Sequence, residues 1–256
     1  MLGPRGDLGY MGYTTFPGDN RTFAALLSVP PGQPSVRLLK ENVAFDKAIS
    51  LIPAITQWVD PEGVDPITDV MTMAGLRNSY REFSLTATVG FVAVGDASFH
   101  SDPVIALGLT FALIQAVELA SALREQNDLH DTSMIFRSAT TPLMRERFDY
   151  ATALDEQRLR MWRGEGVNIT SREGDYALFS LIAGSAAAAT DEEIFRITVR
   201  RMGMLDSNSV LDDNVALQIR IEELFQTSLA TPRPPQGPNF GELMSEVETA
   251  TAQHSS

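Results

Sequence analysis

The pattern of hydrophobic and polar positions changes along the chain, predicting mainly sheet at the start and helices in the second half. Residues 10–16 and 22–29 are rich in aromatic, threonine and aliphatic side chains, and the Pro-Gly-Asp-Asn run at 17–20 separates them. This combination predicts a β-hairpin. Apolar side chains at helical spacing over 41–51 predict a small helical excursion, and 66–74 predicts a return to strand.

The most apolar stretch, residues 88–123, predicts a strand, an acidic turn and a helix in succession. We expect a buried strand over 89–94, a turn at Gly95-Asp96, and a mostly buried helix that begins at Asp102-Pro103. Aspartate is a favoured N-cap, and proline at the first helical position loses no hydrogen bond. This order places one carboxylate beside a helix N-terminus, which suits a polar cofactor.

The second half of the chain carries apolar side chains at helical spacing almost to its end. We expect helices over 131–139, 142–162, 175–189, 191–202 and 212–229. Asp191 is expected to be the N-cap of one of them. The proline-rich run after Thr231 and the polar end predict a flexible tail.

Composition removes several classes of function. The 256 residues include 33 acidic and 20 basic side chains, a net charge of −13, which disfavours nucleic-acid partners and anionic membrane surfaces. The absence of cysteine excludes disulfides and thiolate metal sites and is typical of a reducing compartment. The three histidines, at 100, 130 and 254, are scattered, so no histidine-based metal site is expected. No signal peptide is apparent, and we expect a cytoplasmic location.

Within 88–123, the residues Gly95-Asp96-Ala97, Pro103 and Gly108-Leu109 resemble the second flavin-binding motif of FAD-dependent monooxygenases of the aromatic-hydroxylase type. Thr110 stands where that family often has a small polar residue. Two weaker similarities lie upstream. Residues 9–30 resemble the substrate-side sheet of these enzymes, and residues 73–79 resemble the segment before the motif.

The resemblance implies an α+β chain with a partial flavoprotein-monooxygenase-like fold. Its four expected segments are a substrate-side sheet with a helical excursion (1–85), the flavin-motif strand, loop and helix (86–125), a helical region (126–230) and the tail (231–256). By resemblance the cofactor-binding residues are Gly95, Asp96, Pro103, Gly108, Leu109 and Thr110. Asp96 would accept a hydrogen bond from a ribityl hydroxyl of FAD, and Arg77 would touch flavin or substrate.

The activity implied is oxygenation of a small organic, often aromatic, substrate with NAD(P)H as reductant and O₂ as oxidant. Flavin halogenases and reductases share the motif, and no residue separates them. Catalytic residues and oligomeric state are not predicted. The G-x-G-x-x-G run that holds the FAD pyrophosphate in this family does not occur, so we expect an incomplete fragment. The alternatives left open are a catalytically silent remnant that mediates protein association, and an unrelated α+β binding protein in which Asp96 caps a turn.

Overall fold

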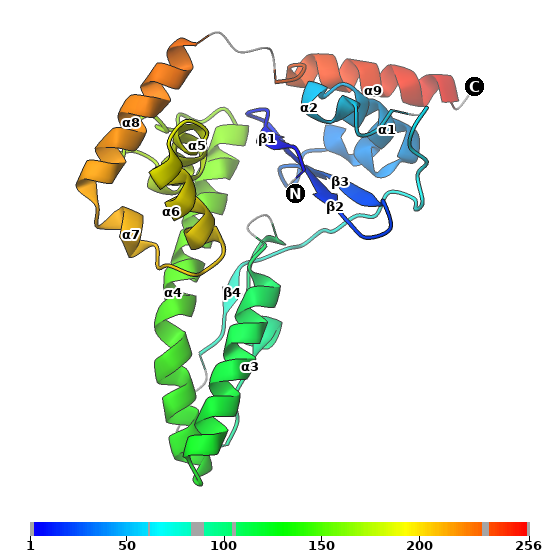
Figure 1. Cartoon of the computed structure of the whole chain (residues 1–256). Coiled ribbons are helices and arrows are strands. Elements are labelled where there is room, and N and C mark those ends of the chain that lie inside the picture. The colour runs from blue at the N-terminus through cyan, green and yellow to red at the C-terminus, as the bar shows by residue number, and fades with distance from the viewer. Residues whose placement is uncertain (1–2, 61, 83–89, 104–105, 232–235, 255–256) are drawn as a thin grey trace. The chain divides into compact units, whose positions relative to one another are not determined.

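A computed structural model describes residues 3–60, 62–82, 90–103, 106–231 and 236–254. The described chain is mixed α+β and mostly helical, with small antiparallel sheets, so the coarse fold class is confirmed. It forms two compact units (Figure 1). Unit 1 comprises 1–74, 159–166 and 232–256, and unit 2 comprises 75–158 and 167–231.

Unit 1 contains the expected hairpin. Strands β1 (Arg5–Asp7), β2 (Gly12–Pro17) and β3 (Phe23–Ser28) form an antiparallel sheet in the order β1-β2-β3. Tyr13 pairs with Leu27, and the turn between β2 and β3 carries two non-glycine residues at positive φ, Asn20 and Arg21. The hairpin prediction is therefore confirmed.

Helices complete unit 1. The predicted helical excursion over 41–51 contains α1 (Asn42–Ser50), which the 3₁₀ helix η1 (Ser35–Lys40) precedes and α2 (Pro53–Thr56) follows. The expected flexible tail instead contains α9 (Phe240–His254), which packs on α1. Its buried side chains Leu243, Met244 and Val247 join a core with Met11, Leu39, Ala44 and Ala48. The polar end predicts a tail, but these three apolar side chains fall on one side of a helix, and their burial holds it in place.

The segment 66–74 is extended but forms no strand, so that prediction is wrong. Its hydrophobic side chains Ile67, Met71 and Met73 are largely exposed. Asn42 holds the segment through its side chain, which donates to Asp69 Oδ1 at 2.8 Å and accepts from the Val70 amide at 2.9 Å. The composition of this segment favours a strand, but no neighbouring strand among the described residues pairs with it, so no strand forms.

Unit 2 is built from helices. They are α3 (Gly108–Glu125), α4 (Leu129–Trp162, of which the residues through Arg158 belong to this unit), α5 (Tyr176–Ala188), α6 (Glu192–Met202), α7 (Ser209–Asp212) and α8 (Val215–Ala230). Two short strands, β4 (Ser79–Tyr80) and β5 (Phe99–His100), pair antiparallel. α4 runs through Pro142, so the two helices expected over 131–162 are one.

The largest core of unit 2 lies among α5, α6 and α8. Phe179, Ala183, Ile194, Ile221 and Phe225 are nearly inaccessible to solvent there. The start of α6 is capped as expected, because Asp191 Oδ1 accepts from the Glu193 and Ile194 amides at 3.0 Å each. Among the described residues, no helix combines the length and apolarity needed to cross a membrane.

Candidate functional site around the Asp96 turn

The start of the flavin-like motif differs from the expectation on both sides of the turn. Residues 90–94 form no strand, and Val89 lies outside the described residues. α3 begins at Gly108 and not at Pro103. Asp102 does not cap a helix; its amide donates to Asn78 Oδ1 at 2.8 Å, and its carboxylate lies 3.5 Å from Arg158 Nη2. Asp102 therefore makes contacts with residues that are distant in sequence and does not cap a helix.

Gly95 anchors the turn, a 3₁₀ helix η2 (Gly95–Ala97), against α3. Its φ is +58°, and a Cβ there would lie 3.4 Å from the Ala112 Cβ, so both conformation and space favour glycine. The Gly95 amide donates to Gln115 Oε1 at 2.6 Å. Gln115, buried within α3, also donates from Nε2 to Ser98 Oγ at 2.8 Å and to Met144 Sδ at 2.9 Å. One buried amide therefore ties the turn to α3 and α4.

The Asp96 carboxylate lies beside the first residue of α3. A Cβ on Gly108 would be 3.7 Å from Asp96 Oδ1, an ordinary contact, so this neighbour does not itself require glycine at 108. Asp96 is exposed, and among the described residues its side chain has no hydrogen-bond or ion-pair partner. Its carbonyl accepts from Arg81 Nη1 at 2.9 Å, and that of Ala97 accepts from the same atom at 3.2 Å.

The other residues implied by the resemblance are only partly gathered here. Leu109 and Thr110 follow Gly108 in the first turn of α3, where Leu109 is exposed. Pro103 is exposed and lies before the helix. Arg77 is also exposed; its carbonyl is 2.9 Å from His100 Nδ1, next to the β4–β5 pair. No described contact joins Pro103 or the Arg77 side chain to Asp96.

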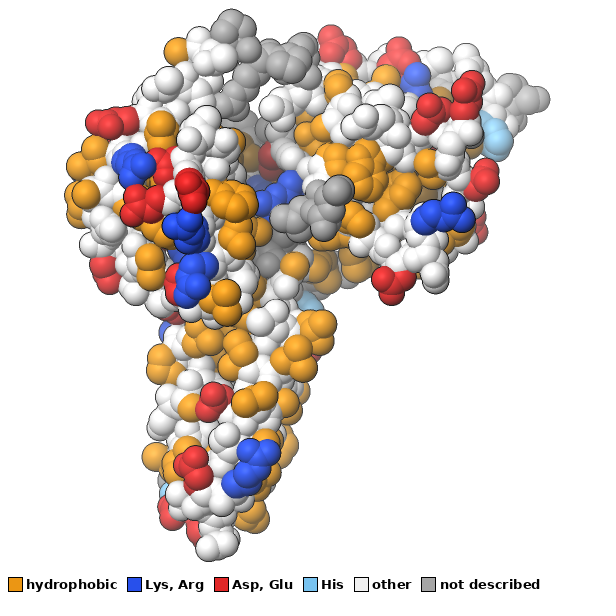
Figure 2. All heavy atoms as spheres, in the orientation of Figure 1, with side chains coloured by type: hydrophobic (Ala, Val, Ile, Leu, Met, Phe, Trp, Pro, Cys, Tyr) orange, Lys and Arg blue, Asp and Glu red, His pale blue; other side chains and the backbone are white. Residues whose placement is uncertain are grey.

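The expectation that this helix is mostly buried is wrong. Only one side of α3 is covered, where Phe111 packs with Phe99, Leu107 and Met144. Leu109, Leu113, Val117 and Leu123 are exposed. A hydrophobic sequence favours a core helix, but α3 is apolar on its uncovered side as well, where hydrophobic side chains gather (Figure 2).

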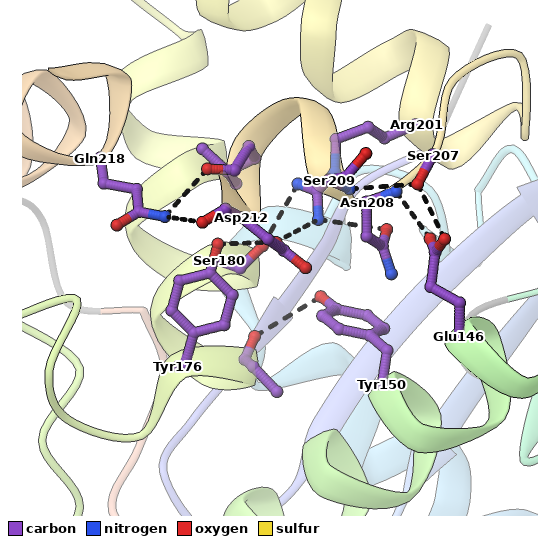
Figure 3. A network of polar contacts seen from close by, with 12 residues as sticks. Glu146, Tyr150, Tyr176, Ser180, Arg201, Ser207, Asn208, Ser209, Asp212 and Gln218 are labelled. Carbon is purple, nitrogen blue, oxygen red and sulfur yellow. Dashed lines mark hydrogen bonds and ion pairs between the residues drawn. The ribbon is translucent and has the colours of Figure 1, made fainter. Parts of the chain in front are cut away.

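A second polar constellation, which the sequence did not signal, lies where α4, α5, α6 and α7 meet (Figure 3). Arg147 and Arg201 are only 4% and 7% exposed. Both donate to Asn208 Oδ1, from Arg147 Nη1 at 2.5 Å and Arg201 Nη2 at 3.2 Å. Glu146 accepts from the Asn208 amide at 2.6 Å and from Ser207 Oγ at 2.7 Å.

The charges of this network balance locally. Glu146 Oε1 is 3.7 Å from Arg147 Nε, and Asp212 Oδ1 is 3.9 Å from Arg201 Nη2. Asp212 also accepts from the Tyr176 hydroxyl at 2.7 Å. Burial lowers the pKa of Arg147, and Glu146 opposes that change. Two carboxylates therefore offset two guanidinium groups, and we interpret the network as structural.

The described residues contain no group of three or more His, Cys, Asp or Glu arranged to hold a metal ion. The Asp96 turn, with its exposed carboxylate beside the start of α3, is the candidate site, and Gln115 is the supporting residue that sequence reasoning missed. The sequence does contain a signal for this role, because Gln115 is a polar side chain on the buried side of an otherwise apolar helix. No protein-family model, curated protein or solved structure matches this chain.

Proposed function

We propose that this chain contributes a flavin site to a FAD-dependent oxidoreductase of the monooxygenase type. The observation that carries the proposal is the Asp96 carboxylate, which is exposed, without a side-chain partner among the described residues, and beside the first residue of α3. A ribityl chain offers hydroxyl donors, and an ionised carboxylate is an acceptor for them. The residues present therefore fit the sugar-alcohol part of a flavin.

The start of α3 supports the same interpretation. Backbone N–H groups in the first turn of a helix have no intrahelical partner and carry partial positive charge. Gly108, Leu109 and Thr110 supply this turn. These groups suit the edge of a flavin ring, on which negative charge develops during reduction.

A bound flavin would supply the redox and oxygen chemistry, with NAD(P)H as reductant and a small organic molecule as substrate. This chain would orient the flavin through Asp96 and the start of α3, while Gln115 keeps the Gly95 turn in place. The chain has no G-x-G-x-x-G run for a pyrophosphate. The contacts therefore concern only the part that riboflavin, FMN and FAD share, and we expect the three to bind with similar affinity.

The test is a titration of the purified chain with riboflavin, FMN and FAD, followed by quenching of flavin fluorescence. Asp96→Ala should weaken binding about tenfold, because a hydrogen bond to a charged group contributes roughly 1.5–3 kcal/mol. Asp131→Ala is the matched control, since Asp131 is an exposed aspartate in the first turn of α4. Absence of binding by the unmodified chain, or equal binding by Asp96→Ala, would contradict the proposal.

A further inference from the structure

Strand β3 has one edge that no described strand covers. It is the last strand in the order β1-β2-β3 (Figure 1), so β2 pairs with one of its edges and the other is open. Successive residues of a strand direct their backbone N–H and C=O groups to opposite edges. The pairing of β2 therefore decides which residues of β3 face the open edge.

The outward residues of β3 follow from the bonds that β2 makes. The Thr15 amide donates to the Pro4 carbonyl at 2.8 Å, so the Thr15 backbone faces β1. Its neighbour Thr14 faces β3 instead, where it pairs with Leu26. The residues that alternate with Leu26 direct their backbone groups outward, and they are Phe23, Ala25 and Leu27. Among the described residues, no hydrogen bond occupies these outward groups.

The open edge of β3 lacks the features that keep strand edges from pairing. Short length, charged side chains and proline are the usual ones. β1, at the opposite edge of the sheet, has three residues, and Arg5 and Asp7 among them are charged. β3 has six residues, Phe-Ala-Ala-Leu-Leu-Ser, with neither charge nor proline. An edge of this kind can accept an added strand, which backbone hydrogen bonds would hold.

Acidic side chains border this edge. Trp58 packs on Phe23, with ring centroids 5.4 Å apart, and Val59 packs on the same hydrophobic cluster as Ala25. The chain continues from there into an acidic stretch, and residues 48–76 contain no lysine or arginine. Four exposed carboxylates lie in this range, those of Asp60, Glu62, Asp65 and Asp69. The surroundings of the edge therefore favour a basic partner.

We propose that the open edge of β3 binds an extended peptide segment of a partner protein, which carries lysine or arginine and is added to the sheet as a strand. Asp60 and Val59 line a surface hollow of about 550 Å³, together with Pro53 and Thr56. A long basic side chain can lay its apolar stem along this hollow and bring its charge to Asp60. A second copy of this chain is the poorer match, because its net charge of −13 would not offset the carboxylates.

The two faces of the sheet set the side-chain pattern of the peptide. Side chains of an added strand would continue these faces at alternate positions. On one face, Ala25 and Leu27 pack on the cluster that includes residues of α1 and α2. On the other face, Ala24 is exposed and Leu26 is half-buried. The structure therefore favours a peptide in which apolar and polar residues alternate, with basic residues at one end.

The first test uses the synthetic peptide Thr-Val-Thr-Val-Thr-Lys-Lys, labelled with fluorescein, and follows its binding to the full chain by fluorescence anisotropy at up to about 100 μM chain. We expect saturable binding that weakens as salt is raised, because salt screens exposed charges. The control peptide carries N-methyl groups on two adjacent central residues, which removes a donor from each of its edges. It should bind at least tenfold more weakly. Absence of binding by the first peptide, or equal binding by the two, would overturn the proposal.

The second test changes the chain. Ala25→Pro removes an outward donor but none of the bonds to β2, and should weaken binding at least tenfold. Asp60→Asn should weaken binding about twofold to fivefold, as expected for an exposed ion pair. Glu248→Gln is the matched control for charge, since Glu248 is an exposed residue of α9 in the same unit. Undiminished binding by a folded Ala25→Pro chain, or equal losses from Asp60→Asn and Glu248→Gln, would contradict the proposal.

The third test locates the peptide on the unmodified chain, and it decides the outcome if Ala25→Pro does not fold. Amide hydrogen exchange is measured by NMR with and without the first peptide. The outward amides of Ala25 and Leu27 should exchange at least tenfold more slowly when the peptide is bound, whereas the Leu26 amide, already bonded to β2, should change little. Unchanged exchange at Ala25 and Leu27 with the peptide bound would place it elsewhere and overturn the proposal.

Discussion

Asn208→Ala should destabilise unit 2 by about 3 kcal/mol. Its Oδ1 accepts from two guanidinium groups, at 2.5 Å from Arg147 and 3.2 Å from Arg201, and both arginines are buried. A hydrogen bond to a charged group contributes roughly 1.5–3 kcal/mol, and the longer bond is placed at or below the lower limit. The Asn208 amide remains in the variant, so its bond to Glu146 is retained. The loss therefore reports on the side chain alone.

The two units provide separate signals for this measurement. Trp58 and Trp162, the two tryptophans of the chain, both belong to unit 1, whereas most helical residues belong to unit 2. In urea, Asn208→Ala should shift the far-UV circular dichroism transition and leave the tryptophan fluorescence transition in place. On heating, the main unit 2 transition should fall by roughly 6–12 °C, at 2–4 °C per kcal/mol for units of this size.

Asn214→Ala is the matched control. Asn214 is the exposed N-cap of α8 and accepts from the Leu217 amide at 3.0 Å, so its loss should cost about 1 kcal/mol. If Asn208→Ala costs no more than this control, the shared acceptor does not stabilise the arginine pair and the structural interpretation of the network is wrong. A shift of both spectroscopic transitions would instead show that the units unfold together.

Two further predictions concern the turn and unit 1. Gln115→Leu leaves the partly buried Gly95 amide without its acceptor and should destabilise unit 2 by about 2 kcal/mol in the same urea assay. Gln126→Leu at the exit of α3 should have little effect, and equal effects of the two substitutions would contradict the anchoring role of Gln115. Burial raises the pKa of Tyr10 from 10.0 to about 12, with Glu242 adding to the effect. The folded chain keeps a proton there that the unfolded chain loses, so stability from this group is full below pH 10 and falls between pH 10 and about 12. Tyr10→Phe should flatten that decline in the tryptophan fluorescence transition, and an unchanged slope would contradict it.

Local signals predicted much of the fold. The hairpin follows from a turn between two β-rich runs, and α6 starts where Asp191 caps it. These elements depend on neighbours within a few residues, which the sequence displays directly. The start of α3 was misplaced because Asp102 has the chemistry of a cap but binds Asn78 and Arg158, which are far away in sequence. The strand at 66–74 failed because a strand needs a partner that composition does not reveal.

In the candidate site, too, local sequence predicts the position of one residue but not its contacts with distant residues. The expectation that Asp96 lies beside the start of a helix agrees with the place of its Oδ1, which is 3.7 Å from where a Cβ on Gly108 would lie. The bond that holds this turn joins Gly95 to Gln115, 20 positions later. Arg147 and Asn208, in the second polar network, are 61 positions apart. A single polar residue in an apolar helix indicates that a buried polar contact exists. The sequence does not show which residue is its partner, because helix packing decides that. Whether flavin binds at Asp96 stays a prediction.

The two sides of α3 make different contacts, and this separates an effect on the proposed flavin site from loss of the helix. Gln115 faces the core and holds the Gly95 turn, whereas Leu113 faces outward and contacts neither the turn nor Asp96 in any described interaction. Gln115→Leu should therefore weaken flavin binding, and Leu113→Glu should leave it unchanged. If Leu113→Glu also abolishes binding and circular dichroism shows lost helix, α3 has failed to fold. If helix content is retained and binding still falls, the outward side of α3 takes part in the site, and the Asp96 turn alone does not form it.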